Sequence, residues 1–206
     1  MKAWLVLLAG VALVLPAVAG ESIDGVSGAS WTEPPLPPLS DEELTQKITD
    51  WLAGHWMLTL ATADGSAAPH VSPVVYFSEG LTVYVRARPD TNKIRNIERN
   101  PAVAYTVWEP APKFDQVRSL QVTGQARILQ GEERGRVMKL FQNAPGTQLS
   151  AIRSFLEKEG IAPEEASPPE DESLAIVAIE PTLARWIERS RSADEGQVWR
   201  AEGRLP

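Results

Sequence analysis

Hydrophobic and polar positions alternate along much of the chain between residues 56 and 129, with the period of two that is typical of half-buried strands. In residues 81–87, Leu81, Val83 and Val85 alternate with polar residues. This pattern predicts five strands, over 56–62, 70–77, 81–87, 102–108 and 119–129. Turn signals at Asp64-Gly65 and Ser78-Glu79-Gly80 make the first three antiparallel neighbours.

Helical spacing appears outside these strands. Ser40 followed by Glu43 forms a capping box, and apolar residues then recur on one face until Gly54, so a helix is predicted there. Residues 91–98 also have helical spacing and stop at Asn100-Pro101, because proline disfavours helix in the residue before it. Two further helices are predicted over 131–141 and 149–159.

The rest of the chain completes an antiparallel arrangement. Gly124, inside a predicted strand, indicates a bulge or a close approach of another segment. An acidic, proline-containing loop over 164–173 precedes a last strand over 174–179, which resumes after Pro181 around 184–187. About six antiparallel strands with helices at the edges, and no strand–helix–strand alternation, predict a small α+β barrel that is mainly antiparallel β.

The two ends of the chain differ from its middle. Residues 1–19 have one charge at Lys2, an apolar run, a break at Pro16 and an Ala-Val-Ala site, which predicts a secretory signal peptide. An uncleaved membrane anchor is the alternative, and either reading places the domain in the periplasm or outside the cell. Residues 20–39 are rich in Pro, Gly and Ser and are predicted to be a tether, leaving 40–206 as one folded domain.

Composition narrows the chemistry. The chain has 206 residues, with 20 Lys and Arg against 27 Asp and Glu, so a net charge of −7 argues against non-specific nucleic-acid binding. It has no Cys and two His, which excludes disulfides, thiolate metal sites and a cysteine nucleophile and leaves little for a histidine metal site. We therefore expect a bound cofactor, or a hydroxyl or carboxylate group, to carry any reaction.

Basic residues gather around the predicted helix at 91–98. Thr91, Asn92 and Lys93 place a hydroxyl, an amide and an ammonium at the helix N-terminus, where free N–H groups and the dipole favour a phosphate. An ordinary solvated lysine is the alternative for Lys93. Nearby arginines would attract an anionic cofactor or substrate, although a solvated face explains them as well; they are Arg86, Arg88, Arg95 and Arg99.

The order and spacing of four segments carry a family resemblance. The segments are Ala61–Gly65, Pro69–Val74, Leu81–Val85 and Thr91–Pro101. Together they resemble the pyridoxamine 5′-phosphate oxidase-like family of FMN-binding split barrels. The resemblance implies a six-stranded split β-barrel with peripheral helices, a homodimer, and FMN in the groove between the two barrels.

The resemblance also implies a set of FMN-binding positions. They lie on the strand that faces the flavin ring, at the end of the next strand, in the phosphate loop, and on two later strands: His70, Val71, Ser72, Pro73, Tyr84, Val85, Asn92, Lys93, Ser119 and Trp186. From the residues alone, His70 also reads as a hydrogen-bonded histidine on a half-buried strand. Tyr84 and Trp186 also read as core aromatics.

One departure limits the functional reading. The Arg-Leu-His element that holds the substrate in pyridoxamine 5′-phosphate oxidases is absent from residues 186–192, which argues against vitamin B6 oxidation and leaves the catalytic residues unassigned. We expect an exported, FMN-dependent oxidoreductase acting on a small molecule. The alternatives are a non-catalytic haem- or flavin-binding module and a deazaflavin-dependent reductase.

A homodimer is also expected from the residues themselves. Val71, Pro73, Val74 and Val75 make one strand apolar at too many positions for a solvated edge. Left exposed as a contiguous patch, these side chains would promote aggregation, so a second copy is predicted to cover them.

Overall fold

The computed structural model describes residues 37–65, 68–113, 116–142, 146–161, 173–188 and 196–201. The predicted signal peptide and residues 20–36 of the predicted tether lie outside these ranges. The elements, in chain order, are α1 (Asp41–Gly54), β1 (Met57–Ala63), β2 (Pro69–Glu79), β3 (Thr82–Ala87), α2 (Asn92–Arg99), β4 (Ala102–Trp108), β5 (Arg118–Ile128), α3 (Gly131–Gln142), α4 (Gly146–Glu159), β6 (Ala175–Glu188) and β7 (Gln197–Arg200). None of the helices in the described ranges is long and apolar enough to cross a membrane.

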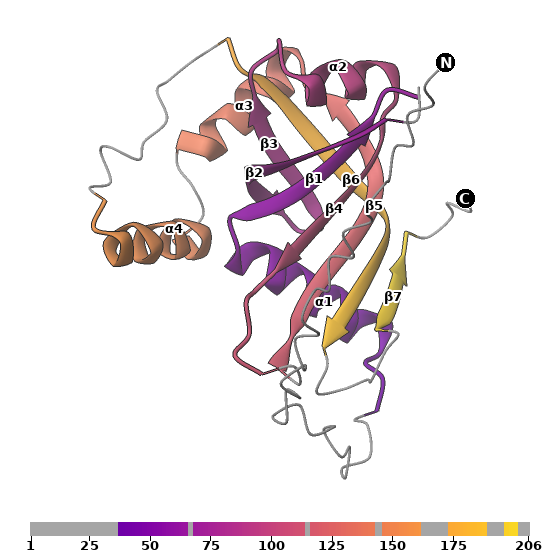
Figure 1. Cartoon of the computed structure of the whole chain (residues 1–206), viewed down its shortest axis with the longest axis vertical. Helices are drawn as coiled ribbons and strands as arrows, with labels where there is room; N and C mark the ends of the chain where they lie inside the picture. Colours follow the sequence, from indigo (N-terminus) through magenta and orange to yellow (C-terminus); the bar gives the residue numbers. More distant parts are fainter. Residues whose placement is uncertain are drawn as a thin grey trace, which may run out of the picture. The chain divides into compact units, whose positions relative to one another are not determined.

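The strands form one antiparallel sheet that closes on itself. Their order is β3-β2-β1-β4-β5-β6-β7, and β3 also pairs with β6, so six strands make a barrel and β7 lies outside it on β6. Figure 1 shows α2 at one end of this barrel and α1 near the other. The predicted α+β fold, a mainly antiparallel split barrel with peripheral helices, is confirmed.

Local sequence signals account for α1. The Ser40 hydroxyl accepts a hydrogen bond from the Glu43 N–H at 3.3 Å, and the Glu43 carboxylate accepts one from the Ser40 N–H at 2.8 Å, so the predicted capping box is confirmed. The apolar face of α1 is buried against the barrel through Leu44, Ile48, Trp51 and Leu52.

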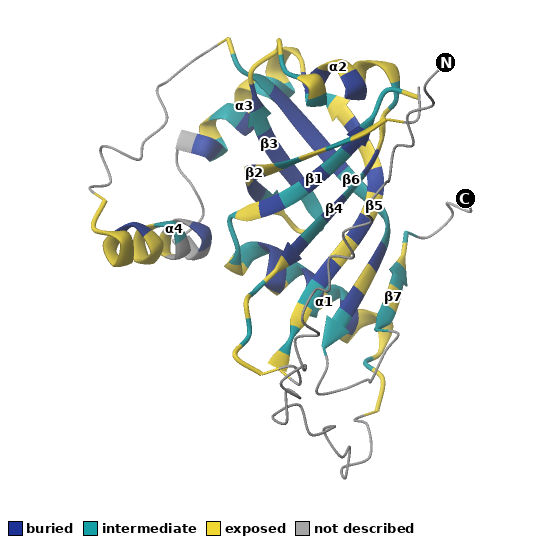
Figure 2. Cartoon of the chain, viewed as in Figure 1, coloured by how far each residue is buried: buried dark blue, intermediate teal, exposed yellow. Residues whose placement is uncertain are grey.

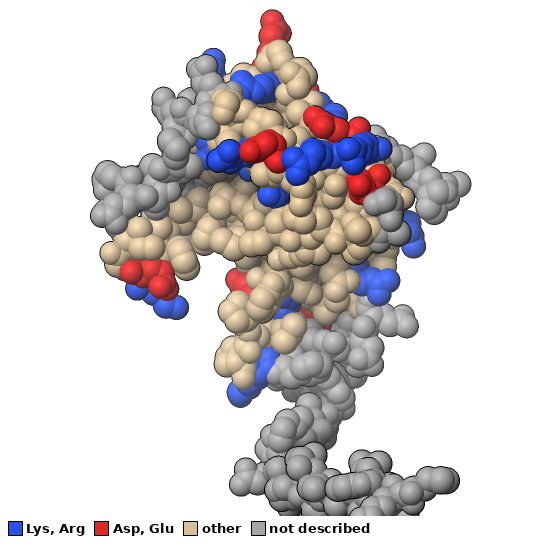
Figure 3. Space-filling view, turned by 45° about the horizontal axis from the view of Figure 1, so that its top comes forward, with Lys and Arg blue, Asp and Glu red and all other residues tan. Residues whose placement is uncertain are grey.

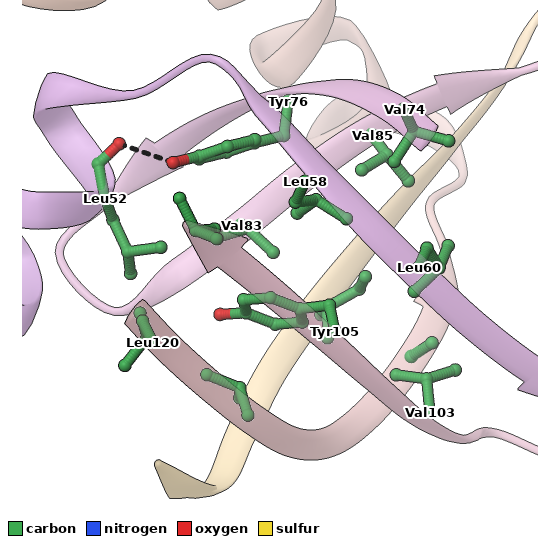
Figure 4. Close-up of a cluster of buried hydrophobic side chains, with 14 of the residues drawn as sticks. Leu52, Leu58, Leu60, Val74, Tyr76, Val83, Val85, Val103, Tyr105 and Leu120 are labelled. Atoms are coloured by element: carbon green, nitrogen blue, oxygen red, sulfur yellow. Dashed lines mark hydrogen bonds between the residues drawn. The ribbon is translucent and has the colours of Figure 1, made fainter. Parts of the chain in front are cut away.

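Side chains from alternate strand positions fill the barrel. Figure 2 shows buried positions alternating with more exposed ones along the strands, as the period-two pattern predicts. In the core, drawn in Figure 4, aliphatic side chains surround Tyr76 and Tyr105, and the Tyr76 hydroxyl donates to the Leu52 carbonyl at 2.9 Å. A second cluster, including Phe77, Tyr84 and Phe141, lies under α3 on the outer side of β3 and β6.

The structure corrects two features of the predicted strands. β6 runs without interruption through Pro181, which pairs with Gly124 where the register between β5 and β6 shifts. A Cβ at Gly124 would lie 2.4 Å from the Glu180 carbonyl oxygen, which confirms the predicted close approach. The short strand β7 was not predicted; its Gln197 amide exchanges two hydrogen bonds with the backbone of Leu39, at 3.0 and 3.1 Å.

Candidate functional site

The site is built on a strand that parts from its neighbour. β2 pairs with β1 along its length from Pro69 to Val75, but with β3 only from Tyr76 to Glu79. Residues 69–75 therefore have one edge that pairs with no strand in the described part of the chain. We call this segment the open edge of β2, and the point where β2 and β3 separate, after the Tyr76–Val85 pair, the fork.

The backbone of the open edge has a defined polarity. The Tyr76 N–H donates to the Trp56 carbonyl at 2.9 Å, so even-numbered residues of β2 direct their backbone groups toward β1. The odd-numbered residues face the open edge. Pro69 and Pro73 are among them, so their missing N–H groups remove no ladder hydrogen bond. Val71 and Val75 present an N–H and a carbonyl to any group that occupies the edge.

Two side-chain polar atoms on the same strand lack partners. His70 Nδ1 and Ser72 Oγ are buried and make no hydrogen bond. The two residues are two positions apart, so their side chains lie on the same face of β2. Buried polar atoms are normally satisfied, and a bound ligand with polar atoms would satisfy these. A flavin, which has hydrogen-bonding groups along its ring, fits this set of donors and acceptors.

The N-terminus of α2 lies at the same end of the barrel as His70. Asn96 of α2 donates to the hydroxyl of Thr62 at 3.1 Å, and Thr62 is the partner of His70 in the β1–β2 register. The N-cap residue Thr91 makes no side-chain cap, because its hydroxyl donates to the Arg88 carbonyl at 2.8 Å. Lys93 forms no ion pair with any described residue. An uncapped helix N-terminus with a nearby ammonium suits a phosphate group.

The arginines around α2 are mostly paired. Arg88 contacts Asp90 at 3.0 Å and holds the pKa of that carboxyl below its usual value. Arg95 donates to the Asp90 carbonyl at 2.6 Å, and Arg99 lies 3.3 Å from the Asp64 carboxylate. Figure 3 shows charged side chains gathered in a row toward the top of the molecule, the end where Figure 1 shows α2.

Three other predicted positions, Tyr84, Trp186 and Ser119, lie away from the open edge within this chain, whereas Val85 lies beside its end. Tyr84 is under α3, where its hydroxyl donates to Glu79 at 3.1 Å and accepts from Arg136 at 3.2 Å. Trp186 is 2% exposed and packs edge-on against Trp51, and Ser119 lies opposite Trp108 in the β4–β5 register. Val85 is buried inside the barrel, in the last pair before the fork. Their cofactor roles stay predictions.

Part of the outer side of four adjacent strands carries no charged side chain; Arg127 of β5 and Glu79 of β2 are outward charged residues that lie beyond it. The strand register places these side chains in rows across β2, β1, β4 and β5, when the β1–β4 register is continued by one residue to Ala63 and by two to Met57: Pro69, Ala63, Ala102 and Gln125; Val71, Ala61, Ala104 and Thr123; Pro73, Thr59, Thr106 and Gln121; Val75, Met57, Trp108 and Ser119. We call this set the uncharged face. A broad area free of charged side chains is visible below the charged row in Figure 3.

The uncharged face corrects one prediction and adds residues that were missed. Val74 was expected on the exposed patch, but it is 9% exposed and belongs to the barrel core, because its neighbours Pro73 and Val75 occupy the outward positions. Met57 and Trp108 were not identified, although they are 45% and 59% exposed. For Trp108, the sequence did contain a signal of the uncharged face: positions 102, 104, 106 and 108, which share one side of a strand, carry no charge.

Comparisons with known proteins agree with this architecture. Over 90 residues the chain is 30% identical to General stress protein 26 of Bacillus subtilis (strain 168); the match covers 44% of this chain and 63% of that protein, just under two thirds of its length. Among solved structures, General Stress Protein 26 from Bacillus anthracis str. Sterne aligns with a TM-score of 0.51 at 21% identity, covering 77% of this chain and 98% of that one. A heme binding protein from Mycobacterium smegmatis aligns with a TM-score of 0.55 at 16% identity, over 80% and 60% of the two chains.

The family model named Pyridoxamine 5′-phosphate oxidase matches residues 44–188, a range that begins in α1 and ends with β6. It therefore contains the whole barrel, the open edge of β2 and the N-terminus of α2. The chain belongs to the pyridoxamine 5′-phosphate oxidase-like family of split barrels.

Proposed function

We propose that this protein binds FMN along the open edge of β2 and is an exported, homodimeric flavin-dependent oxidoreductase acting on a small molecule. The observation that carries the cofactor site is the pair of buried, unpartnered atoms His70 Nδ1 and Ser72 Oγ, at the same end of the barrel as the uncapped N-terminus of α2. Membership of a family whose members bind flavins supports it.

Each part of the site has a role in this proposal. Polar atoms of the flavin ring satisfy His70 and Ser72 and pair with the free backbone groups of Val71, while Asn92 and Lys93 hold the phosphate. When bound, FMN supplies the hydride chemistry, and the protein supplies position and electrostatics. FMN is preferred to FAD because the α2 N-terminus offers one compact phosphate site and the chain has no GxGxxG turn.

A second copy of the chain is the proposed partner of the uncharged face. Val71 and Trp108 are 58% and 59% exposed, and Met57 and Val75 between them are 45% and 43% exposed. Large apolar side chains in one contiguous, charge-free area are a feature of interfaces, not of solvated sheet faces. Pairing through this face would bring two copies of β2 close to the cofactor.

The cofactor proposal is tested by titrating the purified protein with FMN, FAD and riboflavin. We expect FMN to bind more tightly than FAD, and Lys93→Ala to weaken FMN by about tenfold or more while changing riboflavin little, because only FMN has the phosphate. Lys158→Ala, at an exposed lysine of α4, is the matched control. Equal losses for FMN and riboflavin would show that Lys93 does not touch phosphate, and FAD binding as tight as FMN would overturn the preference.

Catalysis is tested separately from binding. In the FMN-loaded protein, we expect a reduced nicotinamide or another hydride donor to bleach the flavin absorbance and an acceptor to restore it. A flavin that binds but is neither reduced nor reoxidised would favour the non-catalytic binding module.

Haem is the second candidate ligand. The Mycobacterium smegmatis protein with the similar fold is a heme binding protein, and His70 has an unpartnered ring nitrogen. The other histidine, His55, has Nδ1 at 2.6 Å from the Trp51 carbonyl and Nε2 at 3.0 Å from Glu109, so His70 is the one to test as an iron ligand. Haem, flavin and deazaflavin differ in their visible spectra, so the absorbance of the purified protein identifies the ligand. If haem binds through His70, His70→Gln should abolish the haem absorbance.

A further inference from the structure

Arg86 occupies an unusual position at the fork. It is the first residue of β3 beyond the Tyr76–Val85 pair, the last pair before β2 and β3 separate. The backbone of β3 continues there, because Arg86 still pairs with Ile176 of β6. Arg86 therefore lies on a rigid strand at the fork, where the open edge of β2 ends, and its side chain is on the outer side of β3, the side of Tyr84 and Phe141.

Arg86 has no anionic partner. Its guanidinium carbon lies 4.7 Å from the centroid of the Phe141 ring of α3, and it makes no hydrogen bond or ion pair with any described residue. The side chain is half-buried, and burial lowers the pKa of the guanidinium without any compensating charge. The group nevertheless stays cationic at neutral pH, because arginine is so strongly basic.

Three other arginines contrast with Arg86. Arg88, Arg99 and Arg136 have carboxylate partners at 3.0, 3.3 and 2.7 Å. A half-buried cation without a partner costs folding free energy, which a structural role would offset with an ion pair. The contact with Phe141 uses the π face of the ring and none of the N–H groups of Arg86, and a guanidinium can form two parallel hydrogen bonds to an oxyanion.

We propose that Arg86, packed on the Phe141 ring, binds the carboxylate or phosphate group of a small anionic substrate at the fork. This site is distinct from the one at the N-terminus of α2, where Asn92 and Lys93 hold the cofactor phosphate. The inference rests on the proposed function only in that the substrate would lie beside the groove that holds the flavin. The substrate class is a small molecule with an anionic group.

The test uses inorganic phosphate as the probe, titrated by calorimetry into the FMN-loaded full chain, in which the cofactor fills the α2 site. We expect Arg86→Gln to weaken phosphate binding by about tenfold or more, the usual effect of losing a bidentate charged hydrogen bond. Arg99→Gln removes an exposed arginine from the same end of the barrel and should leave phosphate binding unchanged. Thermal unfolding of both variants checks that each is folded at the temperature of the titration.

Three results would overturn the proposal. They are phosphate affinity unchanged by Arg86→Gln, equal losses in Arg86→Gln and Arg99→Gln, and weaker binding of FMN but not of riboflavin in Arg86→Gln. The last result would assign Arg86 to the cofactor phosphate. If Arg86→Gln does not fold, Arg86→Lys, which keeps the charge but loses the planar fork, must weaken phosphate binding for the proposal to stand.

Failure of the cofactor proposal is detected independently. If the chain does not retain FMN, the same phosphate titration is made on flavin-free Lys93→Ala protein, in which the α2 site has lost its ammonium. Arg86→Gln is then added to this variant. If phosphate binding is lost, the anion-site proposal is supported even though the flavin proposal has failed. No loss would overturn the anion site as well.

Discussion

The tyrosines of the barrel are held neutral by their surroundings. Burial raises the pKa of Tyr76 and of Tyr105, and the Tyr105 hydroxyl makes no hydrogen bond. Because the folded pKa lies above the unfolded value of 10.0, this effect supports the fold at lower pH. The support is lost as the pH rises past the unfolded pKa toward the folded one.

We therefore predict that tyrosinate absorbance at about 295 nm stays low in the folded protein at pH values near 10. It should rise together with loss of circular dichroism as the protein unfolds in alkali. Chain unfolded in guanidinium is the control and should titrate with the ordinary tyrosine pKa. Full tyrosinate absorbance in a protein that keeps its native spectrum would contradict the burial of Tyr76 and Tyr105.

A second residue-scale prediction concerns Gly124. Any side chain there meets the Glu180 carbonyl at 2.4 Å, and a backbone atom in a paired strand has little room to move. We predict that Gly124→Ala lowers the free energy of unfolding by about 1–3 kcal/mol or more. Gly135→Ala is the control, since nothing lies within 4 Å of the added Cβ and the site is inside a helix, where alanine stabilises by about 1 kcal/mol. Chemical denaturation measures the free energy of unfolding of both variants. No loss in Gly124→Ala would contradict the close approach of β5 and β6 at this position.

At the scale of elements, Gln148 attaches α4 to the rest of the molecule. It is 1% exposed, and its amide donates to the carbonyls of Leu52 and His55 at 3.0 and 2.7 Å and accepts from the Ser78 N–H at 3.2 Å. Phe155 of α4 also packs on Trp56, with ring centroids 5.1 Å apart. One buried amide thus joins three separate elements.

We predict that Gln148→Ala costs about 1–3 kcal/mol of stability and increases hydrogen exchange in α4 more than in the barrel strands. The loss follows from leaving buried backbone groups without partners. Gln46→Ala, which removes an exposed hydrogen bond between Gln46 and Asp50 within α1, should change neither measurement appreciably. Uniform exchange changes across the protein would mean that α4 does not depend on this contact.

At the scale of the whole molecule, the uncharged face predicts the oligomeric state. A lysine at Val71 would place a charge in the proposed interface, so Val71→Lys should shift the protein from dimer to monomer and lower flavin retention. Val198→Lys is the control, because Val198 is also exposed, at 37%, but lies on β7 outside the uncharged face. Light scattering with absorbance detection measures both properties, and a wild-type monomer that keeps its flavin would contradict the shared groove.

Export is the second property of the whole chain to test. From the Ala17-Val18-Ala19 site after the break at Pro16, we predict cleavage after Ala19. The intact mass of protein from the exported fraction should correspond to a chain that begins at Gly20. A chain that begins at Met1 and stays with the membrane would establish an anchor instead.

The sequence by itself determined the elements whose signals are local. The α1 capping box and the alternation along β1 to β5 depend on residues a few positions apart, because a capping box and the strand period are short-range features. The resemblance carried by residues 61–101 also predicted the barrel and the cofactor strand. It did not show which side chains of β2 face outward, since residues 73–75 are all apolar.

Only the tertiary structure decided what depends on distant partners. The passage of β6 through Pro181 comes from its pairing with β5, and the fork forms where β3 leaves β2 but still pairs with β6; β5 and β3 are both remote from β6 in sequence. The strand β7 is tied to Leu39, 158 residues away, through Gln197. The same holds for charge, because Arg99 and Arg136 find carboxylates 35 and 57 residues away while Arg86 finds none. A sequence shows which charged groups exist, but whether each has a partner depends on which segments meet in space. The tertiary structure therefore distinguishes an arginine that is held in an ion pair from one that is available to a ligand.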